Sequence, residues 1–497
     1  MRSMSSLSTT GLLITLLLIS GCAIGPDFES PTAPNAAAYS LDGMPTATEE
    51  ANIAGGNRQK FVPGADVPAE WWNLFRSEPL TQLIALALRN NPTLQAAEAS
   101  LRVAEENLSA GDSAFFPTID GAAGVTREKN SGINGSSGGS RAAFSLFNAS
   151  VKVAYTPDVF GGVRREVEGL AAQTDFQRYG LEAAHLTLTS NVVTAAIQEA
   201  SLRTQIKATQ DIIDGENKQL ELLRQQFNLG GVAKSAVLAQ AATLAQAQAG
   251  MPSLEKQLAQ TRHQLSALVG QLPHEKLEAT FDLSQLTLPE ELPLTLPSQL
   301  VAQRPDIKAA EAQLHAASAY IGQVIAASLP QFSLSASYGG SSSKLADLLS
   351  PQSAVWNLGA NILQPIFYGG QLAHKRAAAH ADFDRAFAQY RGTVLTAFQN
   401  VADVLQALQS DALELKARLA AERAAADSMQ LSRDQFQAGA ISYISLLTAQ
   451  QTYEQTKIAL VKAQAQRYAD TAALFQALGG GWWNRQTVAD AKNSPTE

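Results

Sequence analysis

The chain has 497 residues, of which 45% are hydrophobic and 16% are charged, and its formal net charge is −8. A mean hydropathy of −0.06 leaves no room for a protein built from apolar membrane-spanning helices. The acidic balance, together with the lack of a basic run interleaved with aromatic residues, argues against a nucleic-acid-binding surface.

The N-terminus has the parts of a secretory signal. Arg2 is its only charged residue, an apolar segment follows at residues 12–19, and two small residues precede Cys22. The apolar segment is too short to span a bilayer as a helix. We therefore predict a signal peptide at residues 1–21. Cys22 is the only cysteine, so no disulfide can form within the chain.

Residues 22–68 are rich in Ala, Pro, Gly, Asn and Thr and show no hydrophobic period. This composition predicts an extended tether along the protein surface. A first structural unit, residues 69–270, follows the tether. It opens with a short helix that Ser77 can cap and that ends at Asn90, and a second helix runs from Asn91-Pro92 to about Ala114.

Two strands come next, at residues 118–126 and 145–155, and a Gly/Ser-rich loop joins them. Apolar residues alternate along both strands, which predicts one face suited to lipid. The residues of this face are Ile119, Gly121, Ala123, Val125, Phe147, Ala149, Val151, Val153 and Tyr155.

A run of helix-favouring residues extends from Val163 to Asn228 without a proline. At a rise of 1.5 Å per residue, its roughly 66 residues would span about 100 Å. The chain then turns, Ser235 can cap a returning helix to about Val269, and Pro252 should kink or split that helix.

After a proline-rich linker at residues 271–297, the same order of elements recurs at residues 298–478. It comprises a helix, strands at 331–338 and 356–362, a long helix from Gln371 to Gln437, and a returning helix from about Tyr443. Phe436 and Gly439 match Phe227 and Gly230 at an offset of 209 residues. The chain is therefore a tandem duplication, and residues 479–497 are predicted to be a loose tail.

The second long helix has apolar residues at alternating spacings of three and four. They are Leu405, Leu408, Ala412, Leu415 and Leu419, with Ala426, Met429 and Phe436 continuing the register. This spacing is typical of a coiled coil with left-handed supercoiling. Periodicity alone does not distinguish a solid helical bundle from a hollow barrel of helices.

Four strands cannot close a membrane barrel, because the smallest such barrels have about eight. Open sheet edges are forbidden in lipid. Either the strands lie outside a membrane, or several chains share one barrel, and three chains would supply twelve strands. The predicted fold is mostly α with a small β part.

The sequence offers little support for a catalytic, metal-binding or cofactor-binding site. The segment from Gly135 to Gly139 fits the hydrolase pattern G-x-S-x-G but lies in a loop between strands instead of at a strand-to-helix elbow. Asp158 fits a cap at the end of a strand better than a catalytic acid. No metal-ligand cluster or nucleotide fingerprint is present, so we expect no enzyme activity, cofactor or metal. The six histidines, read as solvated or lumen-facing, are His185, His263, His274, His315, His374 and His380.

Several short motifs, in this order and with this duplication, resemble the TolC-like outer-membrane factors, in their lipoprotein branch. They are Ile19 to Cys22, Gly25 to Phe28, Trp71 to Phe75, Asn90 to Pro92, Phe116-Pro117, Pro157 to Arg165, Arg304 to Asp306, Leu329-Pro330, Pro365 to Gly370 and Phe436 to Gly439. The resemblance covers nearly all of the chain after the signal peptide.

The resemblance implies a homotrimer in the outer membrane of a Gram-negative bacterium. Twelve strands would form a membrane barrel, and twelve long helices a hollow periplasmic barrel. An inner-membrane transporter of the RND type would load small toxic compounds through a periplasmic adaptor, and this protein would conduct them passively outward. Cys22 would be lipidated, and Ala23 after it resembles lipoproteins sent to the outer membrane.

The resemblance also assigns residues near the helix turns. Leu229, Gly230, Gly231, Gly439 and Ala440 would meet the adaptor. Related channels line their periplasmic aperture with a leucine, an aspartate and an arginine; the matching residues here are Ile444, Thr448 and Gln451. Acidic rings favour cations, so the absence of an acid here predicts a neutral, hydrogen-bonded constriction. The alternative is that these three residues only pack between helices.

Three other functions remain open at this stage. A lipid-anchored periplasmic coiled-coil adaptor or scaffold would not need lipid-facing aromatic strands. The same channel could serve protein secretion, because the pump chooses the cargo. An anchored hydrolase lacks a credible triad. What is transported, and by which pump, is not encoded in any motif of the chain.

Overall fold

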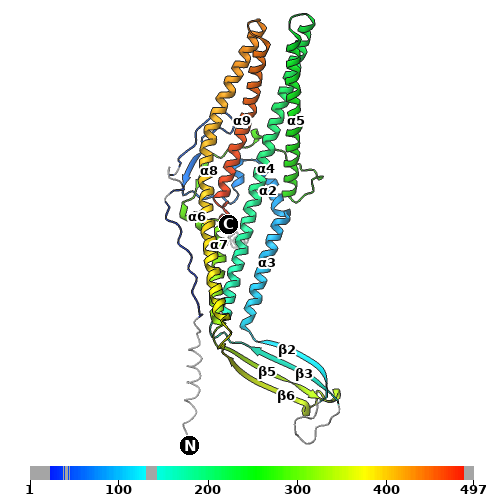
Figure 1. Cartoon of the computed structure of the whole chain (residues 1–497), viewed down its shortest axis with the longest axis vertical. Helices are drawn as coiled ribbons and strands as arrows, with labels where there is room; N and C mark the ends of the chain where they lie inside the picture. Colours follow the sequence, from blue (N-terminus) through cyan, green and yellow to red (C-terminus); the bar gives the residue numbers. More distant parts are fainter. Residues whose placement is uncertain (1–22, 37, 40–42, 44, 130–142, 486–497) are drawn as a thin grey trace, which may run out of the picture. The chain divides into compact units, whose positions relative to one another are not determined.

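A computed structural model describes residues 23–36, 38–39, 43, 45–129 and 143–485 (Figure 1). The expected signal peptide, Cys22 and the motif at Gly135 to Gly139 lie outside these residues. The chain divides into two units. The first comprises residues 1–30, 101–177 and 310–390, and the second comprises residues 31–100, 178–309 and 391–497. Two long helices, α4 (Gly162–Asn228) and α8 (Gln371–Gln437), contribute to both units.

The first unit contains an antiparallel sheet of four strands in the order β2-β3-β5-β6. The strands are β2 (Thr118–Glu128), β3 (Phe144–Tyr155), β5 (Gln331–Ser342) and β6 (Ala354–Leu363). All four predicted strands are thus confirmed. The sheet joins the two copies of the duplication, because β3 of the first pairs with β5 of the second.

The strand register places the predicted apolar stripes on one face of the sheet. Val151 lies opposite Tyr338, and Tyr338 lies opposite Trp356. Val153, Ala336 and Leu358 lie opposite one another in the same way, two residues along each strand. They belong to the same face, because directly opposed residues point to the same side of a sheet. The opposite face carries Asn148, Ser150, Lys152, Ser335, Ser337, Asn357 and Asn361. Large apolar side chains on the first face are exposed in the single chain, among them Ile119, Leu334, Tyr338, Trp356, Leu358 and Ile362.

Most of α3 (Pro92–Asp112) and of α7 (Pro305–Ala326) completes the first unit, together with residues 162–177 of α4 and 371–390 of α8. α7 packs on α8 through two clusters of buried residues. The fully buried residues on the α8 side are Ala379 and Ala386, and the partly buried Phe383 packs against both clusters. None of the described helices is long and apolar enough to cross a membrane.

The second unit holds α2 (Glu78–Asn90), α5 (Lys234–Leu268), α6 (Pro297–Gln303) and α9 (Tyr443–Ala477). Its core includes Trp71, whose ring stacks on Phe475 with centroids 5.2 Å apart. The predicted apolar register of α8 is confirmed, since Leu405, Leu408, Ala412, Leu415 and Leu419 are all buried.

The two segments predicted as tether and linker fold together. β1 (Lys60–Pro63) pairs in parallel with β4 (Glu291–Leu294), and Phe61, Leu292 and Leu294 are buried. Such short strands carry too few residues for a recognisable alternation. The ordered chain also continues past Leu478. The Trp482 indole donates to the carbonyl of Gln303, so residues 479–485 are not part of a loose tail.

The predicted cap of α5 and a split of this helix at Pro252 are both wrong. Ala233 is the N-cap residue and Ser235 lies inside the first turn, so Ser235 does not cap the helix. Pro252 does not split it, and α5 runs as one helix from Lys234 to Leu268. Ser77, in contrast, does hold the N-cap position of α2, although its side chain makes no capping hydrogen bond.

Candidate functional site

The two long helices end in turns of the same construction. Gly230 and Gly439 have φ angles of 78° and 72°, in the left-handed region that side chains disfavour. In the first turn the amide of Gly231 donates to the carbonyl of Gln226 at 2.8 Å. In the second, the amide of Ala440 donates to the carbonyl of Gln435 at 2.8 Å. This bonding closes each helix with a Schellman motif and fixes the direction of the returning helix.

The expected contact residues at the turns lie on the surface. Leu229 is 87% exposed, and Gly230, Gly231, Gly439 and Ala440 are exposed as well. A single exposed apolar residue is ordinary on a protein surface, so the exposure of Leu229 permits a contact with another molecule without requiring one. A Cβ atom on Gly230 or Gly439 would meet nothing within 4 Å, so their glycine identity reflects the backbone conformation and not a lack of space.

An apolar cluster joins the two turns just behind their tips. Leu223 of α4 packs with Tyr443 and Leu446 of α9, and all three are buried. Partly buried residues around them come from both turns: Val232, Ala236, Val237, Ala239, Phe436 and Leu447. The start of α9 is therefore held against the end of α4 and the start of α5. Any movement of α9 at this level must break this cluster.

A polar chain continues from the apolar cluster. The hydroxyl of Tyr443 donates to Oε1 of Gln240, and Nε2 of Gln240 donates to Oε2 and to the main-chain carbonyl of Glu216. Gln240 and Glu216 are buried. Burial raises the pKa of the Tyr443 hydroxyl above its ordinary value. The tyrosine therefore keeps its proton and remains a donor.

The expected aperture residues lie on one exposed face of α9. Ile444, Thr448 and Gln451 follow one another at spacings of four and three, and Ile444 is 70% exposed. The Thr448 hydroxyl donates to the carbonyl of Ile444 at 3.0 Å, and Nε2 of Gln451 donates to Oγ1 of Thr243 at 3.5 Å. None of the three side chains carries a charge.

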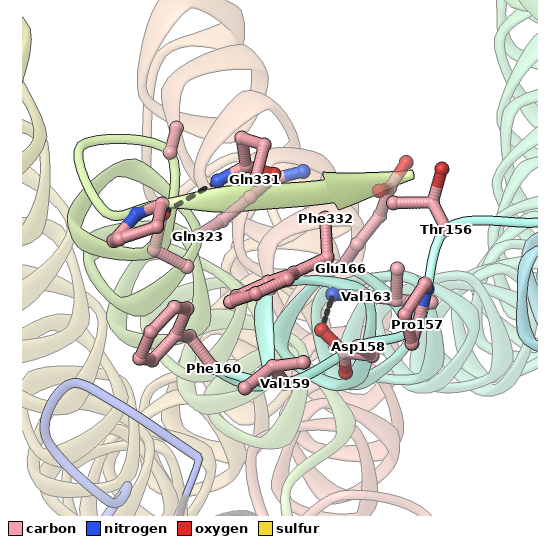
Figure 2. Close-up of a pocket in the computed structure, with 14 residues that line it drawn as sticks. Thr156, Pro157, Asp158, Val159, Phe160, Val163, Glu166, Gln323, Gln331 and Phe332 are labelled. Carbon is pink, nitrogen blue, oxygen red and sulfur yellow. Dashed lines mark hydrogen bonds between the residues drawn. The ribbon is translucent and has the colours of Figure 1, made fainter. Parts of the chain in front are cut away.

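At the other end of α4, the junction with β3 surrounds a cavity of about 190 Å³ (Figure 2). Asp158 accepts hydrogen bonds there from the amides of Val163 and Arg164, at 3.0 and 2.9 Å. These amides belong to the first turn of α4, whose N–H groups have no partner within the helix. The interpretation of Asp158 as a cap is confirmed.

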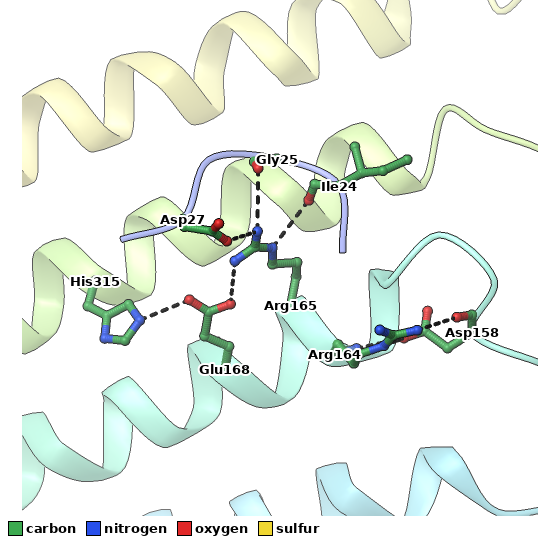
Figure 3. A network of polar contacts seen from close by, with 8 residues as sticks. All are labelled: Ile24, Gly25, Asp27, Asp158, Arg164, Arg165, Glu168 and His315. Atoms are coloured by element: carbon green, nitrogen blue, oxygen red, sulfur yellow. Dashed lines mark hydrogen bonds and ion pairs between the residues drawn. The ribbon is translucent and has the colours of Figure 1, made fainter. Parts of the chain in front are cut away.

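The residues after Cys22 are bound to this junction by Arg165 (Figure 3). Its guanidinium donates to the carbonyls of Ile24 and Gly25 and forms ion pairs of 2.7 Å with Asp27 and Glu168. Arg165 is buried although it is charged, so its partners stabilise it in place of water. Apart from the motif in which Arg165 lies, no local pattern predicted this clamp.

The histidines have two kinds of environment. His263, His274, His374 and His380 are exposed, in agreement with the prediction. His315 differs, since it stacks on Phe28 at 4.3 Å and lies 2.9 Å from Oε1 of Glu168. His185 is half-buried, and burial lowers its pKa. Among the described residues, no three His, Cys, Asp or Glu side chains are grouped to hold a metal ion.

Comparison with known proteins agrees with this arrangement. The model of the outer membrane efflux protein family matches residues 83–271 and 296–480, one segment for each copy of the duplication. The pyoverdine export outer membrane protein OpmQ of Pseudomonas aeruginosa is 30% identical over 425 residues, 84% of this chain and 89% of OpmQ. The probable outer membrane lipoprotein SilC of Salmonella typhimurium is 26% identical over 478 residues, 94% of this chain and 97% of SilC.

A solved structure of the outer-membrane channel OprN superposes with a TM-score of 0.83 at 25% identity, covering 93% of this chain and all of OprN. The family model covers most of the chain, and both copies of the repeat match it. The chain is thus an outer-membrane component of the efflux type, and it belongs to the outer membrane efflux protein family.

Proposed function

We propose that three copies of this chain form a passive exit duct across the outer membrane. The observation that carries this proposal is the four-stranded sheet, which has one apolar face and unpaired edges at β2 and β6 in the described chain. Lipid does not tolerate unpaired edges, so β2 of one copy pairs with β6 of the next. Three sheets supply twelve strands, an even number within the range of membrane barrels.

The helices extend this duct into the periplasm, where a periplasmic adaptor meets the turns. The proposed contacts are Leu229, Gly230 and Gly231 of the first turn and Gly439 and Ala440 of the second. An inner-membrane transporter of the RND type loads the cargo. The duct itself performs no chemistry, because movement through it is driven by the transporter. Small toxic compounds are the proposed cargo, in keeping with the name of the similar toluene efflux pump outer membrane protein TtgC of Pseudomonas putida.

We also propose that Cys22 is acylated and anchors each copy in the membrane. The clamp of Arg165 supports this, because it holds Ile24 and Gly25 at the first turn of α4, and the Ile24 amide donates to the carbonyl of Phe160 in the segment that follows β3. The lipoprotein name of SilC is a second support. Residues 22–68 then serve as the anchored N-terminal segment, and residues 69–270 and 298–478 as the two repeats.

Replacing Cys22 by serine is expected to remove the acyl groups but not the trimer, since the barrel buries far more apolar surface than one anchor. Intact-mass spectrometry of the mature protein measures the first effect, and electrophoresis without heating measures the second. An unmodified cysteine in the mature wild-type protein would show that the anchor does not exist.

A neutral aperture is expected to discriminate weakly between ions. Replacing Thr448 by aspartate adds three carboxylates to the aperture of a trimer. Under a salt gradient, the reversal potential should then shift toward the equilibrium potential of the cation. The matched control is Gln260→Asp, which adds the same charge on an exposed part of α5 away from the turns. Equal reversal potentials for the two variants would mean that Thr448 does not line the pore.

A further inference from the structure

We propose that a docking segment after β6, Pro365 to Tyr368, packs into the junction of α3 and β2 in a second copy of this chain. The acceptor junction is the surface around Phe116 and Ile119. In the same contact, β6 pairs with β2 of the second copy in one defined register. This docking rests on the proposed trimer, and it names the residues through which two of its copies meet.

Three consecutive large side chains of the docking segment are exposed in the single chain. Ile366 is 92% exposed, Phe367 is 84% exposed and Tyr368 is 50% exposed. The acceptor junction has the same property, since Phe116 and Ile119 are 69% and 71% exposed. A group of exposed apolar side chains, unlike a single one, marks a contact with another molecule or with lipid. Both surfaces lie at free edges of the sheet, because β2 and β6 are its outer strands.

The first repeat shows what such a segment packs against. The counterpart of the docking segment is Pro157 to Phe160, 208 residues earlier, and two glycines follow each segment. The ring of Phe160 lies 6.3 Å from the ring of Phe332, at the start of β5. Val159 and Phe160 also line the cavity of Figure 2, together with residues from the end of α7. Within one chain, the first repeat therefore docks on the α7–β5 junction of the second repeat.

The acceptor junction is the duplicate of the α7–β5 junction. Leu329 corresponds to Phe116, and Phe332 corresponds to Ile119, each 213 residues apart. Leu329 and Phe332 are half-buried, whereas Phe116 and Ile119 are exposed. The described part of the chain thus has one docking segment without an acceptor and one acceptor without a docking segment. Because the two surfaces differ, they join copies head to tail, and such contacts close into a ring.

The pairing of β3 with β5 predicts the register between copies. Val151 of β3 lies opposite Tyr338 of β5. One more residue separates β6 from the proline that follows it than separates β3 from its own, so Val151 corresponds to Leu358, 207 residues later. Tyr338 corresponds to Val125 of β2, 213 residues earlier. Leu358 of one copy should therefore lie opposite Val125 of the next.

This register keeps the apolar face continuous across the interface, because Leu358 and Val125 both belong to that face. A slip by one residue would turn one apolar stripe to the polar side of the sheet. A slip by two residues would keep the face but would move Tyr368 about 7 Å along the strand, away from Ile119. The docking segment therefore selects one register among those that the apolar pattern allows.

The polar contact of the first repeat is not repeated between copies. Glu168 of α4 lies 2.9 Å from His315 of α7. The corresponding residues are Arg376 of α8 and Arg102 of α3, and both are basic. Apolar packing and strand hydrogen bonds hold the copies together instead. Salt screens charges but not apolar contacts, so the trimer should withstand high salt.

Disulfide cross-linking tests both contacts in the Cys22→Ser full-length protein, which has no other thiol. Two double variants carry the predicted pairs: Leu358→Cys with Val125→Cys, and Tyr368→Cys with Ile119→Cys. Directly opposed residues of neighbouring strands have Cβ atoms about 5 Å apart. The two partners of a pair cannot meet within one chain, because β3 and β5 lie between β2 and β6. After oxidation in outer membranes, we expect covalent trimer in both double variants and in none of the single variants.

The control pair is Leu358→Cys with Gly121→Cys, which could link only if the strands slipped by four residues, about 13 Å. A trimer in which the control pair links, or in which one of the predicted pairs does not, overturns the proposal. Bilayer conductance is recorded in parallel. A trimer that conducts without the predicted links contradicts the docking alone, whereas protein that stays monomeric in the membrane contradicts the duct itself.

A second measurement distinguishes the neighbouring copy from lipid as the partner of the docking segment. Phe367→Ser should lower the temperature at which the trimer dissociates, because it removes an apolar contact between copies. Leu349→Ser is the matched control, since Leu349 is 89% exposed in the loop between β5 and β6, and it should leave this temperature unchanged. Equal dissociation temperatures for the two variants would place the docking segment in lipid and overturn the proposal.

Discussion

Replacing Leu358 by arginine is expected to prevent stable assembly in the outer membrane. Leu358 lies in the middle of β6, is 77% exposed, and belongs to the apolar face that it shares with Ala336 of β5. A positive charge on the lipid face near the centre of the bilayer costs about 2–4 kcal/mol in membrane barrels. A trimer would carry three such charges, so the total penalty is severe.

The matched substitution is Asn357→Arg, one residue earlier on the same strand. Asn357 points to the polar face with Ser337, where an arginine remains in water. We therefore expect Asn357→Arg to assemble normally, and the measurement is the amount of heat-modifiable trimer in purified outer membranes. If both variants assembled equally well, this face of the sheet would not contact lipid, and the assignment of the barrel would be wrong.

Replacing Arg467 by methionine is expected to destabilise the second unit, at about 1–3 kcal/mol for each buried acceptor left without a donor. Arg467 of α9 is fully buried, and its guanidinium donates to the Thr48 hydroxyl and to the carbonyls of Gly55 and Asn57. Methionine fills a similar volume but leaves these buried acceptors without a donor. Residues 46–58 should then detach from α9.

Thermal unfolding and limited proteolysis within residues 46–58 measure this loss. The control is Arg418→Met on α8, where the arginine pairs with Glu414 at the surface and contributes at most about 1 kcal/mol. We expect a lower unfolding temperature and new cleavage only for the Arg467 variant. Equal behaviour of both variants would show that Arg467 does not hold the N-terminal segment in place.

Much of this fold could be predicted because its elements are long or strictly periodic. The 67 residues of α8 match the predicted helix at both ends, and the alternating stripes of β5 and β6 predicted the apolar face correctly. The duplication strengthened the prediction of the two helix turns, because Gly230 and Gly439 occupy equivalent positions in the two copies. Local patterns repeated at a fixed offset are a stronger signal than either copy alone.

The features that escaped prediction depend on contacts between distant segments. The pairing of β1 with β4 joins residues about 230 apart, and no local pattern indicates it. Arg467 and Glu216 are charged residues at buried positions, and a sequence pattern assigns such residues to the surface.

A through-going pore in the assembled protein should appear as single-channel conductance in a planar bilayer. The purified mature protein is compared with Tyr443→Phe, which lacks the hydroxyl that holds the start of α9. We predict discrete conductance steps of uniform size. If the unaltered protein rests with its aperture closed, the steps should appear in the Tyr443→Phe variant. Correctly inserted protein that shows no steps in either form would contradict the duct and would favour a periplasmic scaffold.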